Sequence, residues 1–265
     1  MILDILYQDD YLVAIDKPSG LFVHPTDLDR TALTCLPILR DQLGKWVYPA
    51  HRLDRGTSGV VLFALSPEGA GALSAQFENR GVLKEYLAIV RGFSPESGTI
   101  DHAYRPPDSD EPVEAVTAFV REATAELPFA VGPYQTARYS LIKAMPQTGR
   151  QHQIRKHCAH MNHPVVGDHD YGDGRHNRFF REHFGLHRLL LMATRIQFRH
   201  PETGETLSVE APVPSRVARV CAQVGWEEVV HRYGSGKQGP VKARSAAKYT
   251  DSGCEDEAPL MGVVP

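Results

Sequence analysis

The sequence predicts an α+β fold built on a mixed, mostly antiparallel sheet with flanking helices. Two observations predict this class. Apolar runs of strand length recur along the chain and are bounded by polar or Pro/Gly-containing turns. The segments with helical spacing stand among them without strict strand–helix–strand alternation, which a parallel sheet would require. The chain has 265 residues, 42% of them hydrophobic, enough for one large domain with a substantial core.

The first third of the chain is expected to hold four strands and a helix. Ser66 fits a helix N-cap and Pro67 the first helical position, so a helix is expected over 66–81. Its apolar residues Leu73 and Phe77 are four apart and share a face. The expected strands are 2–7, 11–16, 60–65 and 84–92.

The rest of the chain repeats this mixture. Ile154, Cys158 and Met161 have the i, i+4, i+7 spacing of one helical face, which predicts a helix over 151–161. A last helix is expected over 214–226. Strands are expected at 114–120, 137–145, 187–200 and 206–212, and loops at the polar segments 96–112 and 123–136.

Residues 1–232 are expected to form one domain, and residues 233–265 a disordered tail, because the tail is rich in Gly, Ser and Lys and then in Asp and Glu. No run of eighteen apolar residues occurs, and the acidic N-terminus does not resemble a signal peptide. The four cysteines are scattered, as expected of free thiols in a reducing compartment. These features predict a cytoplasmic protein that does not bind membranes.

Charge is unevenly distributed along the chain. The net charge is −3, but residues 138–200 contain 11 Lys and Arg against 4 Asp and Glu, and nine of the 13 histidines. One face of an acidic protein could therefore bind a polyanion such as a nucleic acid. A solvated basic surface is the simpler alternative, and charge alone does not exclude it.

The stretch HRLDRGTSG, residues 51–59, places Asp54 between Arg52 and Arg55, immediately before a buried apolar run. Neighbouring guanidinium groups favour the ionised form of a carboxyl group. An ionised aspartate can act as a nucleophile or as a base. An aspartate that only orders the turn through ion pairs is the alternative.

Two further stretches carry candidate site residues. In TGRQHQIRKH, residues 148–157, Arg150 and Arg155 are five apart and so do not share a helical stripe. One could pair with Asp54 and the other could hold a phosphate. Lys84 and Tyr86 share one face of a strand by period two. A tyrosine there could stack on a base or take part in proton transfer, or it could belong to the core.

Hydrolytic chemistry fits the sequence less well. A metallohydrolase would need a ligand set, and an HExxH arrangement with its adjacent glutamate is lacking. A glycoside hydrolase would normally need two carboxylates, and Asp54 has no acidic partner in these stretches. The residues that could otherwise be metal ligands are His152, His157, His160, His163 and Asp168.

Taken together, residues 51–59, 84–92 and 148–172 resemble the RluA-type RNA pseudouridine synthases in order and spacing. Residues 9–25 also resemble the family's opening strands and its lysine-proline-glycine turn, so the resemblance covers roughly residues 1–225. Residues 175–193 are similar to the TruC-type branch, which modifies uridine 65 of transfer RNA. Asn162 stands where a glycine is usual, and Met192 where many relatives have histidine.

The resemblance implies a pseudouridine synthase catalytic domain over residues 1–232, with a central RNA-binding cleft and no preceding S4-type domain. It implies that Asp54 is the catalytic aspartate, that Tyr86 lies against the uracil, and that Arg155 pairs with Asp54. Arg52 would help to fill the space left by the flipped base, and Ile154 would line the pocket. The other substrate-binding residues expected are Arg55, Thr57, Lys84, Arg150, His152 and Gln153.

The implied reaction detaches uracil from the ribose, rotates it and rejoins it through C5. It is redox-neutral and consumes no water, so no cofactor and no metal are expected. The expected partner is tRNA, bound by a monomer without an obligate protein partner. Asp54 could attack C1′ or remove a proton at C2′, and the sequence does not choose between them. The alternatives are an rRNA substrate within the same family, or an RNA-binding module that does not catalyse.

Overall fold

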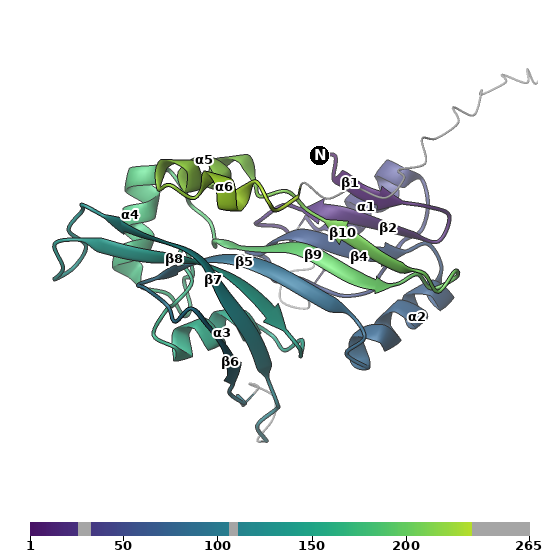
Figure 1. Ribbon diagram of the computed structural model, residues 1–265. Helices are drawn as coiled ribbons and strands as arrows, with labels where there is room; N and C mark the ends of the chain where they lie inside the picture. The colour runs from purple at the N-terminus through teal and green to yellow at the C-terminus, as the bar shows by residue number, and fades with distance from the viewer. Residues whose placement is uncertain (26–32, 106–110, 235–265) are drawn as a thin grey trace, which may run out of the picture.

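The computed structural model describes residues 1–25, 33–105 and 111–234. Over these ranges the chain forms one 10-stranded sheet in the order β1-β2-β4-β9-β5-β8-β7-β6, with β10 paired to β9 and β3 to β4 (Figure 1). The strands are β1 Asp4–Gln8, β2 Leu12–Lys17, β3 Tyr48–Pro49, β4 Ser58–Ala64, β5 Leu83–Arg91, β6 Ser97–Asp101, β7 Val116–Leu127, β8 Ala137–Pro146, β9 Leu191–Arg199 and β10 Thr206–Glu210.

The described helices lie on the faces of this sheet. They are α1 Cys35–Leu43, α2 Pro67–Glu78, α3 Gln153–His160, α4 Gly174–Phe184, α5 Ser215–Gln223 and α6 Glu227–Val230. All the strand pairs are antiparallel except β4 with β9, which is parallel. The α+β class and the mostly antiparallel sheet expected from the sequence are therefore confirmed.

Strand β4 is buried on both faces, which explains its unbroken apolar sequence. Val61 and Phe63 pack in the cluster that contains α1, and Val60 and Leu62 pack in the cluster that contains Leu73 of α2. Successive side chains of a strand point to opposite faces, so one strand supplies two cores. The same alternation in β5 turns Leu87 and Ile89 toward α4 and α5, and Ala88 and Val90 toward α3.

The parallel contact between β4 and β9 depends on Gly59. Its φ of +112° is in the region that favours glycine, and a Cβ there would lie 2.0 Å from the carbonyl oxygen of Ala193. The neighbouring pair is Ser58 with Met192. This close approach joins the two halves of the sheet immediately after the turn that carries Asp54.

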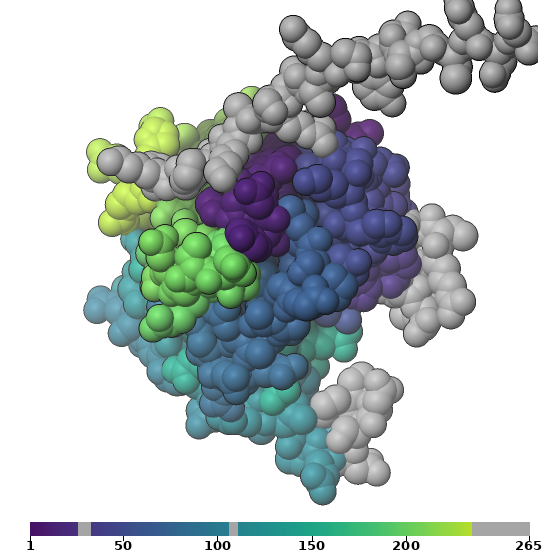
Figure 2. Space-filling model, turned by 90° about the vertical axis from the view of Figure 1, so that its right-hand side faces the viewer, coloured from purple at the N-terminus to yellow at the C-terminus, as the bar shows by residue number. Residues whose placement is uncertain are grey.

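Figure 2 shows the outer edge of the molecule, where the β9–β10 turn lies beside α2 and the N-terminal strands. Two side-chain contacts hold these parts together. Gln76 of α2 donates to the carbonyl oxygen of Arg199 at 2.8 Å, and the ring of His200 bonds the Asp9 carboxylate at 2.8 Å. The β9–β10 hairpin is thus fixed to the half of the sheet that carries the candidate site.

The helix expected at 66–81 begins as predicted, with the Ser66 hydroxyl accepting a 3.0 Å bond from the backbone N–H of Gly69, and ends at Glu78. The loop predictions over 96–112 and 123–136 are partly wrong. Strand β6 lies in the first segment, and β7 continues to Leu127 in the second. Most of β6 is exposed, so no apolar run marks it. The end of β7 does alternate, with Ala123, Ala125 and Leu127 against the core and Thr124 and Glu126 exposed, but alanines make this pattern only weakly apolar.

Asn162 has a φ of +60°, directly after the end of α3. Glycine and asparagine tolerate this left-handed conformation best, so Asn162 can replace the glycine that is usual in the resembling family. Residues 235–265, most of the tail expected to be disordered, lie outside the described residues, whereas Tyr233 packs against the core cluster around α5. No helix in the described ranges is long and apolar enough to cross a membrane.

Candidate active site

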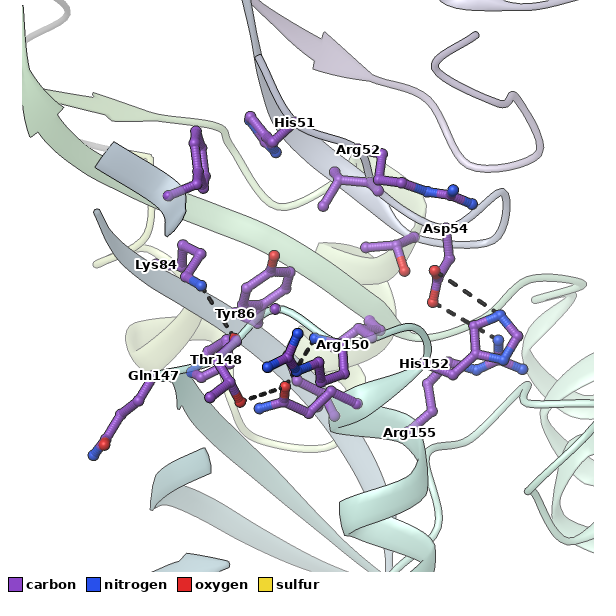
Figure 3. A pocket seen from close by; sticks show the side chains of 18 of the residues that line it. His51, Arg52, Asp54, Lys84, Tyr86, Gln147, Thr148, Arg150, His152 and Arg155 are labelled. Carbon is purple, nitrogen blue, oxygen red and sulfur yellow. Dashed lines mark hydrogen bonds and ion pairs between the residues drawn. The ribbon is translucent and has the colours of Figure 1, made fainter. Parts of the chain in front are cut away.

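A cavity of about 470 Å³ opens between the turn before β4, the start of β5 and the start of α3 (Figure 3). Asp54 reaches it from one side, and Lys84 and Tyr86 reach it from β5. The cavity therefore joins the three stretches that the sequence singled out. The predicted site residues that line it are Arg52, Asp54, Thr57, Lys84, Tyr86, Arg150, His152, Gln153, Ile154 and Arg155.

The turn that carries Asp54 is tied to the loop after β2. The N–H of Gly20 donates to the carbonyl oxygen of Arg55 at 2.8 Å, and the Ser19 hydroxyl donates to that of Gly56 at 2.7 Å. The buried ammonium of Lys17 donates to the carbonyl oxygen of Leu21 and, at 3.3 Å, to that of Arg55. Through these bonds, the lysine-proline-glycine turn holds the backbone of the turn that carries Asp54 in place.

Asp54 faces two nitrogen-bearing side chains at the start of α3, Arg155 and His152. Its Oδ2 lies 3.8 Å from Nη1 of Arg155, and its Oδ1 lies 3.9 Å from Nε2 of His152. The Asp54 side chain keeps 21% of its surface exposed, whereas that of Arg155 keeps 9%. The carboxylate is thus compensated in charge and still open toward the cavity.

Arg155 makes its short contacts elsewhere. Its Nε and Nη2 donate to the two carboxylate oxygens of Asp168 at 2.7 and 2.6 Å, and Nη2 also donates to Asp170 at 2.7 Å. The predicted pairing of Arg155 with Asp54 is found at ion-pair distance, but Asp168 is the closer partner. Asp168 was considered only as a possible metal ligand, although it lies with Arg155 in the stretch 148–172.

His152 has a φ of +57°, an uncommon backbone conformation for a non-glycine residue and one often found at functional sites. Its Nδ1 lies 3.1 Å from the hydroxyl of Tyr171, which leaves Nε2 directed at Asp54. Burial lowers the pKa of His152, although the Asp54 charge opposes this. The ring is therefore mainly neutral near pH 7 and contributes hydrogen bonding more than charge.

Tyr86 and Lys84 form the part of the cavity supplied by β5. Burial, with a smaller contribution from the Asp54 charge, raises the pKa of Tyr86, so its phenol stays neutral. Lys84 donates to the carbonyl oxygen of Thr148 at 3.2 Å, and burial lowers its pKa to about 8. The two residues share a strand face, as their spacing predicted.

Gln153 is buried, and its amide is occupied by the protein. Its Oε1 accepts bonds from the Thr148 hydroxyl at 2.7 Å and from the N–H of Arg150 at 3.0 Å. Its Nε2 donates to Val116 and Thr117 of β7. Gln153 therefore fixes the turn before α3 against the sheet, and the substrate contact expected of it stays a prediction.

The remaining predicted residues differ in their placement. Arg52 is exposed at the rim of the cavity, and Ile154 and Thr57 are buried in its wall. Arg55 is not among the described residues that line the cavity. Its Nε donates to the carbonyl oxygen of Gly20 at 3.0 Å, and its guanidinium lies 5.5 Å from the ring centroid of Phe22. The side chains of Arg52 and Arg55 therefore point in different directions from the same turn.

His51 is a cavity residue that the sequence reasoning did not select. Its Nε2 accepts a 3.1 Å bond from the backbone N–H of Leu62, and its ring lies 4.6 Å from that of Phe77. Burial, aided by the nearby Lys84 charge, lowers its pKa to about 4. The neutral imidazole forms part of the cavity wall, and only its position directly before Arg52 could have suggested this.

The histidines considered as metal ligands lie apart. His157 bonds the Thr117 hydroxyl, His163 the carbonyl oxygen of Arg91, and His160 stacks on His102 with 3.7 Å between ring centroids. Among the described residues, no three His, Cys, Asp or Glu side chains gather in a group that could hold a metal ion. The ligand set of the metallohydrolase alternative is therefore not assembled in this part of the chain.

A family model described as RNA pseudouridylate synthase matches residues 11–160, the segment that carries Asp54, Tyr86 and Arg155. The chain belongs to this family. Relatives from several bacteria carry the name "tRNA pseudouridine synthase C". That of Pasteurella multocida is 47% identical over 80% of this chain and 92% of its own length, and that of Haemophilus influenzae is 43% identical over 86% and 100%. That of Pectobacterium carotovorum is 45% identical over 87% of this chain, which spans 64% of that longer protein.

Solved structures of the pseudouridylate synthase family share the fold. "Human RNA Pseudouridylate Synthase Domain Containing 1" superposes with a TM-score of 0.64 at 29% identity, covering 80% of this chain and 84% of that one. "Human RNA Pseudouridylate Synthase Domain Containing 4" gives 0.65 at 26% identity, covering 83% and 92%. The catalytic fold and the enzyme class expected from the motifs are thereby confirmed.

Proposed function

We propose that this RNA pseudouridine synthase converts one uridine of tRNA, uridine 65, into pseudouridine. The single observation that carries the proposal is that Asp54, Tyr86 and Arg155 meet in one cavity of a chain whose relatives at 43–47% identity are named for tRNA. The position within tRNA rests on the similarity of residues 175–193 to the TruC-type branch. We propose that the enzyme acts as a monomer, since the proposed roles need no side chain from a second subunit.

Asp54 is the group that acts on the ribose. Its carboxylate is open to the cavity and lies 3.8 Å from the positively charged Nη1 of Arg155. Ionised, it can attack C1′ as a nucleophile or take the proton from C2′, and either route releases the uracil. The target nucleotide must leave its stack to reach Asp54, at a cost of a few kcal/mol.

Tyr86 holds the detached base. It comes from the neighbouring strand, and its neutral phenol offers a ring face for packing and a hydroxyl for hydrogen bonding. Because its pKa is raised, Tyr86 is not a phenolate at neutral pH, and loss of the C5 proton proceeds through the hydroxyl or through water. Lys84, on the same strand face, adds a positively charged group to the cavity wall.

Cations at the rim bind the RNA backbone. Arg52 is exposed there, and Arg150 lies where its Nε donates to the carbonyl oxygen of Glu114 at 3.2 Å. Lys156 lies 3.6 Å from the ring centroid of Tyr104, which combines a positive charge with an aromatic face. Phosphate contacts of this kind offset part of the cost of base flipping.

The test is tritium release from RNA labelled at uracil C5, because the reaction replaces that hydrogen with the bond to ribose. Unmodified tRNA and rRNA are compared, with Asp54→Asn as the control. Release from tRNA alone, mapped to uridine 65, supports the proposal. Release from rRNA alone keeps the chemistry and overturns the substrate, and RNA binding without release from either favours a module that does not catalyse.

A further inference from the structure

Asp168 is a buried carboxylate that is not among the expected catalytic residues Asp54, Tyr86 and Arg155. Its side chain has 0% of its surface exposed, and both of its oxygens bond Arg155, at 2.7 and 2.6 Å. Its Oδ1 also accepts from the backbone N–H groups of Asp170 and Tyr171, at 3.0 and 3.1 Å. A buried carboxylate with four such donors stays ionised, and these contacts lower the pKa of Asp168 against the effect of burial.

The two edges of the Arg155 guanidinium have different partners. The edge formed by Nε and Nη2 is bound to Asp168, and Nη2 also bonds Asp170. Nη1 is the nitrogen that faces Asp54, at 3.8 Å. Because the guanidinium is planar and rigid, fixing one edge also fixes the direction of the other.

We propose that Asp168 is a positioning residue of this enzyme, which sets the distance between Arg155 and Asp54. The inference rests on the proposed role of Asp54. Without Asp168, Arg155 can turn two nitrogens toward Asp54 and form a tight pair, which would draw the carboxylate away from the ribose. Asp170 does not prevent this, because its side chain is 57% exposed and water competes for it.

Helix α4 holds Asp168 in turn. The Asn177 amide donates to the carbonyl oxygen of Asp168 at 2.6 Å, and its Oδ1 accepts from the N–H of Gly167 at 2.7 Å. Asn177 lies in the stretch that resembles the TruC-type branch. A continuous set of contacts therefore runs from α4 through Asp168 and Arg155 to Asp54.

The experiment compares Asp168→Asn with Asp173→Asn in single-turnover and steady-state tritium release. Asp173 is a matched control, because its carboxylate also pairs with an arginine at 2.7 Å, that of Arg91, and belongs to the same loop. Displacement of a catalytic contact by about 1 Å can cost about 10²-fold in rate. We expect Asp168→Asn to lose about that factor in kcat, with KM and RNA affinity largely unchanged, and Asp173→Asn to retain its activity.

Arg155→Gln distinguishes positioning from general destabilisation. If Asp168 acts through Arg155, Asp168→Asn causes little further loss once Arg155 is replaced, because coupled residues are not additive. If the loss in the double variant is instead the product of the two single losses, the proposal is overturned. Melting temperatures of the unsubstituted protein, the single variants and the double variant are measured in parallel.

Two further outcomes are separable. No release by the unsubstituted protein contradicts the proposed function, whereas equal kcat in Asp168→Asn and Asp173→Asn contradicts this inference alone. If Asp168→Asn does not fold, Asp168→Glu tests the same edge of Arg155, because it keeps the negative charge and moves the carboxylate that holds Nε and Nη2. A several-fold loss in its kcat that disappears in the Arg155→Gln background supports the proposal, and an unchanged kcat overturns it.

Discussion

Oδ2 of Asp54 lies 3.8 Å from Nη1 of Arg155, close enough for an ion pair and longer than a hydrogen bond. At this separation a positive charge lies beside the carboxylate, and the oxygen that acts on the ribose in the proposed mechanism accepts no hydrogen bond from Arg155. A shorter pair would restrict the movement of Asp54, and an absent one would leave a half-buried charge uncompensated.

Asp54→Asn is expected to abolish measurable turnover while largely sparing RNA affinity, because the amide preserves shape but cannot act as nucleophile or base. Tritium release and an equilibrium RNA-binding assay measure the two effects separately. Turnover close to that of the unsubstituted protein would refute the role given to Asp54.

Tyr86→Phe separates the ring of Tyr86 from its hydroxyl. The ring should still pack against the base, so RNA affinity is expected to stay nearly constant. The hydroxyl is lost from proton transfer, and the single-turnover rate is expected to fall by about 10²-fold. An unchanged rate would show that the hydroxyl has no part in the chemistry and that Tyr86 acts by packing alone.

Lys84 predicts a pH dependence. Burial lowers its pKa from 10.5 to about 8, so between these values the unfolded chain binds a proton that the folded protein does not. Stability therefore rises with pH across this window, and below pH 8 the buried charge destabilises the fold. Lys84→Met should be more stable than the unsubstituted protein at pH 7, by a margin that shrinks from pH 8 to 10.5.

In the unsubstituted protein, RNA affinity should depend on pH in the opposite direction to stability, and Lys84→Met should weaken this dependence. The affinity of the unsubstituted protein for RNA is expected to fall as pH rises through 8, because the ammonium loses its charge, whereas that of Lys84→Met should vary less. Lys17, whose pKa burial also lowers to about 8, is present in both proteins. The difference between them therefore isolates Lys84, and parallel pH profiles would contradict its presence in the RNA site.

Gly59→Ala should destabilise the protein by more than about 3 kcal/mol, because the new Cβ would meet the carbonyl oxygen of Ala193 and φ is +112°. Gly71→Ala is the matched control. Gly71 is an exposed position in α2, and no described atom lies within 4 Å of its added Cβ. That change should stabilise by about 0.5–1 kcal/mol. Thermal unfolding of both variants measures the difference, and equal stabilities would contradict the tight β4–β9 contact.

The fold class, most of the strands and the helix capped by Ser66 could be predicted from the sequence alone. These follow from local chemistry, since periodicity and capping act over a few residues. The sequence also pointed to Asp54, Tyr86 and Arg155, through three motifs in one order. Strand β6 and the end of β7 were missed, because β6 is mostly exposed and the apolar residues that alternate at the end of β7 are mainly alanines.

The partners of the polar side chains around Asp54 depend on the tertiary structure. In the folded chain, Arg55 bonds the loop after β2 and Gln153 bonds the turn before α3. Arg155 has a closer partner in Asp168 than in Asp54. These outcomes depend on contacts between segments far apart in the chain, and on which side chains are left in a cavity once the rest have paired. The spacing of residues in a sequence can indicate a catalytic motif. The direction of a side chain and the competition for its hydrogen bonds are properties of the packed fold.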